Sequence, residues 1–124
     1  MNFQIQAPIA PPGEHRVAFV RCEEVKEGKY GRPALRWIFQ VQDGPYRGHE
    51  LIRVTGYDPR LGTSLGELLQ SLYGSELKEG ETVDPVNDLR GQLFEVFAIP
   101  GEGGGGLLQT IRPVTLSDDQ PTVF

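Results

Sequence analysis

Residue types that build covalent or metal-based frameworks are scarce in this 124-residue chain. It has one cysteine, Cys22, which excludes an internal disulfide framework, and its only histidines are His15 and His49, so we expect no zinc site. No apolar run reaches the roughly 18 residues that a membrane span needs, and no charged segment followed by an apolar stretch opens the chain. These absences predict a soluble, intracellular domain without membrane association.

Catalytic signatures are missing as well. The adjacent acids Glu23 and Glu24 lie in a strand-like segment, where neighbouring side chains point to opposite faces and do not converge on a metal. The histidines accompany no nucleophile signature. The glycine-rich segment 101–106 lacks the lysine and the Ser or Thr of a phosphate-binding loop. We therefore expect neither an enzyme nor a bound cofactor.

Glycine and proline are abundant, with 16 and 10 residues respectively, and this punctuation favours short strands joined by turns over a helical bundle. In the clearest strand, Leu35, Trp37 and Phe39 alternate with polar or smaller residues, so Trp37 is expected in the core. Cys22 is expected to be a small buried residue, and of Phe94 and Phe97 one should be buried and one exposed. The predicted strands are 15–24, 34–42, 47–54, 92–99 and 107–116.

One segment has helical periodicity instead. Apolar residues recur at Leu65, Leu68, Leu69 and Leu72, which forms one stripe on a short helix. Thr63 or Ser64 can cap its start, and Gly74 is expected to end it.

The order of three strands, one helix and two strands predicts a mostly β fold. It favours a five-stranded Greek-key barrel of the oligonucleotide/oligosaccharide-binding (OB) type, with one short helix between strands three and four. A split β-sandwich and a small α+β sheet are the competing folds. We expect an extended N-terminal arm over 1–13, the barrel domain over 14–116 and a flexible acidic tail over 117–124.

Charge is unevenly distributed along the chain. Residues 1–60 carry nine Lys and Arg against seven acids, whereas residues 61–124 carry three against ten. Single-stranded nucleic acid is bound by basic side chains along a groove and by aromatic rings on which bases stack. In an OB barrel, strands two and three and the loops 1–2 and 4–5 form that groove. The candidate DNA-binding residues are Lys26, Lys29, Tyr30, Arg32, Arg36, Tyr46, Arg47, Arg53, Tyr57 and Arg60.

A family resemblance agrees with this interpretation. The strings KYGRPALRWIFQVQDGPYRGHEL and GTSLGELL resemble phage and prophage proteins of about this length, over roughly residues 12–115. Those proteins have a predicted OB barrel, lie among replication and recombination genes and are taken for single-stranded DNA-binding proteins. The resemblance implies the same function here, with a cytoplasmic location in a bacterial or phage-infected cell.

The C-terminal tail has a likeness of its own. Bacterial single-stranded DNA-binding proteins end in an acidic run, a proline and a terminal phenylalanine that partner enzymes bind. This chain resembles that pattern in order, although only two acids precede the proline and two residues separate it from the terminal ring. The resemblance implies recruitment of replication or recombination proteins by Asp118, Asp119, Pro121 and Phe124.

Two other functions fit the same barrel. It can serve as a protein-interaction module that holds a peptide or another phage factor, or as an inhibitor that mimics DNA with its acidic half. A homo-oligomer is compatible with each of these functions.

Overall fold

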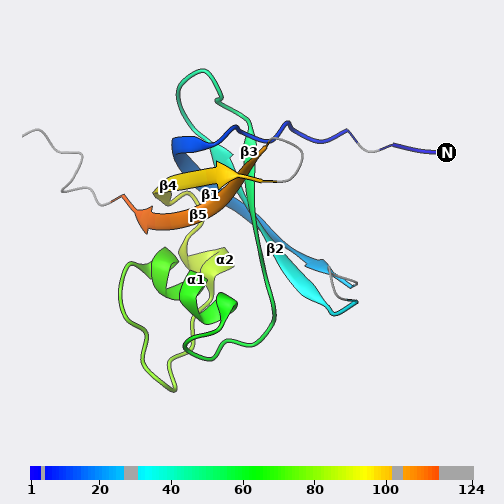
Figure 1. Cartoon of the computed structure of the whole chain (residues 1–124). Helices are drawn as coiled ribbons and strands as arrows, with labels where there is room; N and C mark the ends of the chain where they lie inside the picture. The colour runs from blue at the N-terminus through cyan, green and yellow to red at the C-terminus, as the bar shows by residue number, and fades with distance from the viewer. Residues whose placement is uncertain (4, 27–30, 102–104, 115–124) are drawn as a thin grey trace, which may run out of the picture.

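A computed structural model describes residues 1–3, 5–26, 31–101 and 105–114, which form a five-stranded antiparallel sheet with two short helices beside it (Figure 1). The sheet order is β3-β2-β1-β4-β5. The prediction of a mostly β fold with a short helix between the third and fourth strands is confirmed. The elements are β1 (Gly13–Val25), β2 (Ala34–Val41), β3 (Glu50–Thr55), α1 (Ser64–Tyr73), α2 (Pro85–Asp88), β4 (Leu93–Pro100) and β5 (Gly106–Pro113).

The long central strand β1 pairs with two neighbouring strands. Its first half pairs with β4, and its second half pairs with β2. The register with β2 shifts between Phe19 and Arg21, so Val20 is an extra residue in β1 and is 44% exposed. Such a bulge bends a strand and changes which residues face the core. Arg16 before the bulge and Arg21 after it therefore both point away from the core.

The core lies between the inward faces of the strands and the apolar stripe of α1. Trp37 is 3% exposed, which confirms its predicted core position, and its ring packs near Phe19. Phe94 is fully buried while Phe97 is 43% exposed, so the expected division between these two rings is also confirmed. Cys22, which was expected to be buried, is only partly buried and packs against the core. The fully or almost fully buried large side chains are Phe39, Phe94, Ile38, Leu51, Leu68, Leu72, Val17 and Val41.

Helix α1 has the ends that its sequence predicts. The Thr63 side chain accepts a hydrogen bond of 3.1 Å from the backbone N–H of Gly66, so Thr63 and not Ser64 is the N-cap. Gly74 ends the helix in the left-handed conformation, with φ of 69°. Neither helix of the described residues has the length and apolar character needed to cross a membrane.

Several bounds differ from the sequence prediction. Strand β1 begins at Gly13 and not at 15, so the sheet includes the last residue of the predicted arm, and β5 ends at Pro113 and not at 116. Strand β3 begins at Glu50 and not at 47, because the turn after β2 continues through Gly48, whose φ is 90° and whose N–H bonds to the carbonyl of Val41. The four-residue helix α2 was not predicted. It is too short for an apolar period, and it depends on local capping by Asp84 and on Pro85 at its first position.

Part of the N-terminal arm is hydrogen-bonded to the sheet. Glu50 of β3 donates to the carbonyl of Pro8 at 2.8 Å and accepts from the N–H of Ala10 at 2.9 Å. On the other side, Gly106 of β5 donates to the carbonyl of Ala10 at 2.8 Å. A Cβ at Gly106 would lie 2.9 Å from that same oxygen, so this close approach requires glycine. The arm thus connects the two strands at the edges of the sheet.

Candidate functional site

The outward side of β1, β2 and β3 is the first candidate surface, and we call it the outer face. Two cross-strand rows define it, because antiparallel partners point to the same side of a sheet. Arg21, Ile38 and Ile52 form one row, and Glu23, Arg36 and Val54 form the other.

The arginines of the outer face form ion pairs with glutamate carboxylates. Arg21 donates from Nε to Oε1 of Glu23 at 2.6 Å, and Nη1 of Arg36 lies 3.9 Å from Oε2 of the same carboxylate. Nη1 of Arg21 also donates to Oε2 of Glu50 at 3.4 Å. Because β2 lies between β1 and β3, the Arg21 side chain must cross β2 to reach Glu50. This crossing is consistent with the burial of Ile38, which is 1% exposed although it points outward.

This arrangement determines the electrostatics of the face. The hydrogen bond from Arg21 lowers the pKa of Glu23, and the charges of Arg21 and Arg36 add to that effect. Two guanidinium groups and two carboxylates balance here. The outer face is therefore charged but close to neutral in the free protein.

Exposed cations without an ion pair to any described residue lie at one end of this face, where β1 and β2 meet. Lys26 and Arg32 are exposed on either side of the loop between these strands. β3 ends beside them, since Thr55 pairs with Leu35, and the next turn carries Tyr57, which is 43% exposed. Partial burial is the main cause that raises the pKa of Tyr57, and the nearby charge of Glu24 on β1 adds to it.

Arg60 extends the same connection toward α1. Its side chain is 86% exposed and lies 3.6 Å from a carboxylate oxygen of Asp58. We refer to Lys26, Arg32, Tyr57 and Arg60 as the basic end. The sequence candidates Lys29 and Tyr30 lie outside the described residues.

Arg53 is placed apart from the other candidates. In the register between β2 and β3 it pairs with Trp37, so its side chain points to the side of the sheet opposite the outer face. Arg36, by contrast, lies on the outer face. Its Nη1 donates to the backbone carbonyls of Leu108 at 3.4 Å and Gln109 at 3.1 Å, both in β5. Its guanidinium group therefore links β3 to β5, and a DNA contact by this residue stays a prediction.

Tyr46 and Arg47 lie in the turn at the other end of β2 and β3, away from the basic end. The Tyr46 ring is 41% exposed and stands edge-on to His15 and His49, with centroid distances of 6.0 and 5.5 Å. Arg47 is exposed. The structure thus separates the sequence candidates into two groups.

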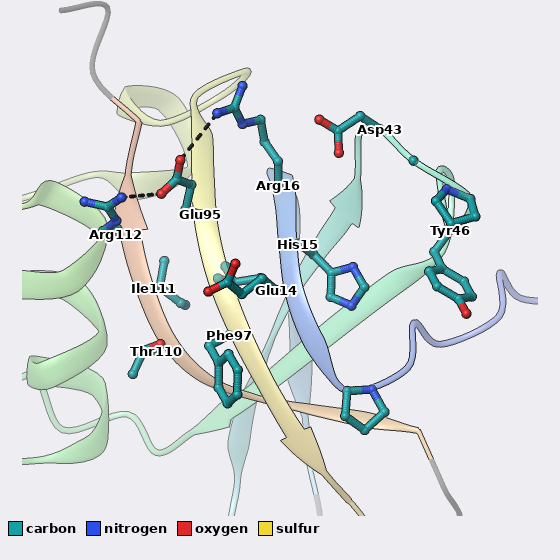
Figure 2. A pocket seen from close by; sticks show the side chains of 14 residues that line it. Glu14, His15, Arg16, Asp43, Tyr46, Glu95, Phe97, Thr110, Ile111 and Arg112 are labelled. Atoms are coloured by element: carbon teal, nitrogen blue, oxygen red, sulfur yellow. Dashed lines mark hydrogen bonds and ion pairs between the residues drawn. The ribbon is translucent and has the colours of Figure 1, made fainter. Parts of the chain in front are cut away.

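Tyr46 borders a groove of about 770 Å³ that runs over β1, β4 and β5 (Figure 2). Phe97 is the second exposed ring in this groove. One wall is an ionic chain of two ion pairs that share Glu95. Nη2 of Arg16 donates to Oε1 of Glu95 at 3.3 Å, and Nη2 of Arg112 donates to Oε2 of the same carboxylate. The bond from Arg112 is the main cause of the lowered pKa of Glu95.

Sequence reasoning did not find this ionic chain. It depends on the pairing of Glu95 with both Arg16 and Arg112 across three strands, and no local pattern encodes that register. The one signal of this groove in the sequence was the expectation that either Phe94 or Phe97 is exposed.

No protein-family model, curated protein or solved structure matches this chain. Among the described residues, no group of three or more His, Cys, Asp and Glu is placed to hold a metal ion. The tail candidates Asp118, Asp119, Pro121 and Phe124 lie outside the described residues, so their role in partner binding stays a prediction.

Proposed function

We propose that this protein binds single-stranded DNA without sequence preference, in phage DNA replication or recombination, and that its sheet is an OB-type barrel. The strand order β3-β2-β1-β4-β5 and the position of α1 between β3 and β4 support the barrel. Two contacts support closure between the edge strands. Arg53 bonds from β3 to β5, and the arm segment 8–10 bonds to both.

The observation that carries the function is the basic end beside the outer face. Lys26, Arg32 and Arg60 are exposed in the segments that adjoin this end, and Tyr57 presents a half-exposed ring there. A strand bound at this end meets exposed cations for its phosphates and, at Tyr57, a ring for a base. Every base has a π-face, so such a site binds without reading sequence. The predicted contacts of Lys29 and Tyr30 belong to the same loop.

A fluorescent poly-dT oligonucleotide tests this function. Its anisotropy should rise with protein at low salt, and affinity should fall as salt is added. With about four phosphate contacts, log K should change with log salt at a slope of about −3, since each contact contributes roughly −0.7. An affinity that does not depend on salt would contradict this binding mode.

A matched pair of variants locates the contact. Lys26→Gln with Arg32→Gln should weaken binding and make the salt slope less negative by about 1.4 if each residue contacts one phosphate. Lys78→Gln with Arg90→Gln removes the same charge from exposed positions elsewhere and should have a much smaller effect. Equal effects of the two double variants would show that only net charge matters.

Protein binding at the groove of Figure 2 is the second candidate function. Tyr46 and Phe97 are both more than 40% exposed in that groove, and exposed rings in a concave site are typical of interaction surfaces. Phe97→Ser should then reduce the binding of a protein partner without changing dT affinity. Deletion of 117–124 tests the predicted tail separately, and it should leave dT affinity equal or slightly higher.

A further inference from the structure

The carboxylate of Glu23 lies between two arginines on the outer face. Arg21 reaches one of its oxygens and Arg36 approaches the other, with distances of 2.6 and 3.9 Å. The three side chains are between 33% and 46% exposed, so solvent and ligands have access to the pair. The second carboxylate, on Glu50, bonds to Nη1 of Arg21 and orients its side chain across β2.

Guanidinium groups bind carboxylates and phosphates with the same donor geometry. Glu23 therefore marks a position where two arginines converge on one anion. We propose that Arg21 and Arg36 form a phosphate-binding pair for the DNA backbone, and that Glu23 occupies the phosphate position in the free protein. This inference rests on the proposed function and adds Arg21, which the sequence candidates did not include.

Exchange of one anion for the other should cost little free energy here. Ion pairs between partly exposed side chains are weak. A rotation about the side chain of Glu23 is enough to free Nη1 of Arg36 and Nε of Arg21, while Glu50 keeps its contact with Nη1 of Arg21. Each phosphate that binds must displace Glu23, so this residue lowers the affinity for DNA. Its removal should raise the affinity.

The neighbouring acid provides a matched control. Glu24→Gln makes the same charge change one residue further along β1, but Glu24 points to the opposite side of the strand. No ion pair involves Glu24 among the described residues. Glu23→Gln should raise dT affinity by about 3–10-fold, because two exposed ion pairs no longer compete, whereas Glu24→Gln should change it by less than about twofold.

A double-mutant cycle tests whether the arginines carry the effect. In a background with Arg21→Gln and Arg36→Gln, the gain from Glu23→Gln should disappear. A gain that persists there would overturn the inference, as would equal gains from Glu23→Gln and Glu24→Gln when the wild-type protein binds dT. Failure of the wild-type protein to bind dT at low salt would instead contradict the proposed function itself.

A measurement on the unaltered protein keeps the inference testable if Glu23→Gln folds poorly. The Nε–H resonance of Arg21, which bonds to Glu23 in the free protein, should shift on titration with dT. The Nε–H resonance of Arg112, which bonds to Glu95 on β4 and is not among the candidate DNA-binding residues, serves as the internal reference. A shift at Arg112 without one at Arg21 would overturn the inference.

Discussion

Nε1 of Trp37 donates a hydrogen bond of 2.9 Å to Oγ1 of Thr55, and both side chains are buried. The bond joins β2 to the end of β3, close to the residues that lead into the basic end. It also satisfies the one polar atom of the largest core ring, which would be costly to bury without a partner.

Substitutions at Trp37 should therefore act on stability and not on DNA affinity. Trp37→Ala should cost about 3–5 kcal/mol of unfolding free energy, because a buried indole is lost. Trp37→Phe should cost about 1–3 kcal/mol, because it keeps a ring but loses volume and the bond to Thr55. Urea denaturation measures both. A well-folded Trp37→Phe protein that no longer binds dT would show that the indole contacts DNA.

Arg53 separates a structural role from a DNA contact. Arg53→Met keeps most of the apolar stem but removes the bonds to the β5 carbonyls of Leu108 and Gln109. We expect a loss of about 1–3 kcal/mol in unfolding free energy, as for hydrogen bonds from a charged group, with little change in dT affinity. Parallel urea and anisotropy measurements distinguish the roles. Unchanged stability with weaker dT binding would assign Arg53 to the DNA contact.

Acid should weaken the fold through Glu95. Hydrogen bonds from Arg112 and Arg16 lower its pKa in the folded state. A carboxylate with a depressed folded pKa contributes stability fully above its unfolded pKa of about 4.3, and that contribution is lost as the pH falls through the folded pKa. The urea midpoint of the wild-type protein should therefore fall more steeply below about pH 4.3 than that of Glu95→Gln. Parallel pH profiles of the two proteins would contradict this.

The strands and α1 were predictable because their signals are local. The alternation around Trp37 and the leucine stripe of α1 each lie within one element, and buried residues at those positions confirm both. The turn after β2 was harder, since Gly48 continues it with a left-handed conformation that many turn types share. The helix α2 depends on one capping residue and one proline, which predict a turn equally well.

The candidate surfaces were only partly predictable, because they depend on the register between distant segments. Alternation correctly placed Arg36 opposite Leu35, but the bulge at Val20 determines that Arg21 and Glu23 share the side of Arg36. In the same way, the long-range contact of Arg53 with β5 gives that residue protein partners that no sequence pattern indicates. A list of basic residues cannot distinguish a free cation from one already paired.

Tyr57 and Tyr46 provide the sharpest comparison for the proposed function. Both rings are about equally exposed, at 43% and 41%, but Tyr57 lies at the basic end and Tyr46 stands between two histidines at the other end of β2 and β3. If bases stack at the basic end, Tyr57→Ala should weaken dT binding by about 1–3 kcal/mol while the melting temperature stays nearly constant.

Tyr46→Ala removes a ring of the same kind and exposure, so it controls for any general effect of losing an aromatic surface. It should leave dT affinity within about twofold of the wild type, because Arg16 and Arg112, the cations that line the same groove, are both paired with Glu95. Anisotropy titrations with dT and thermal melts on both variants complete the test. A larger loss of affinity from Tyr46→Ala than from Tyr57→Ala would move the DNA path from the basic end to the groove of Figure 2, where Arg16 and Arg112 would then supply the phosphate contacts.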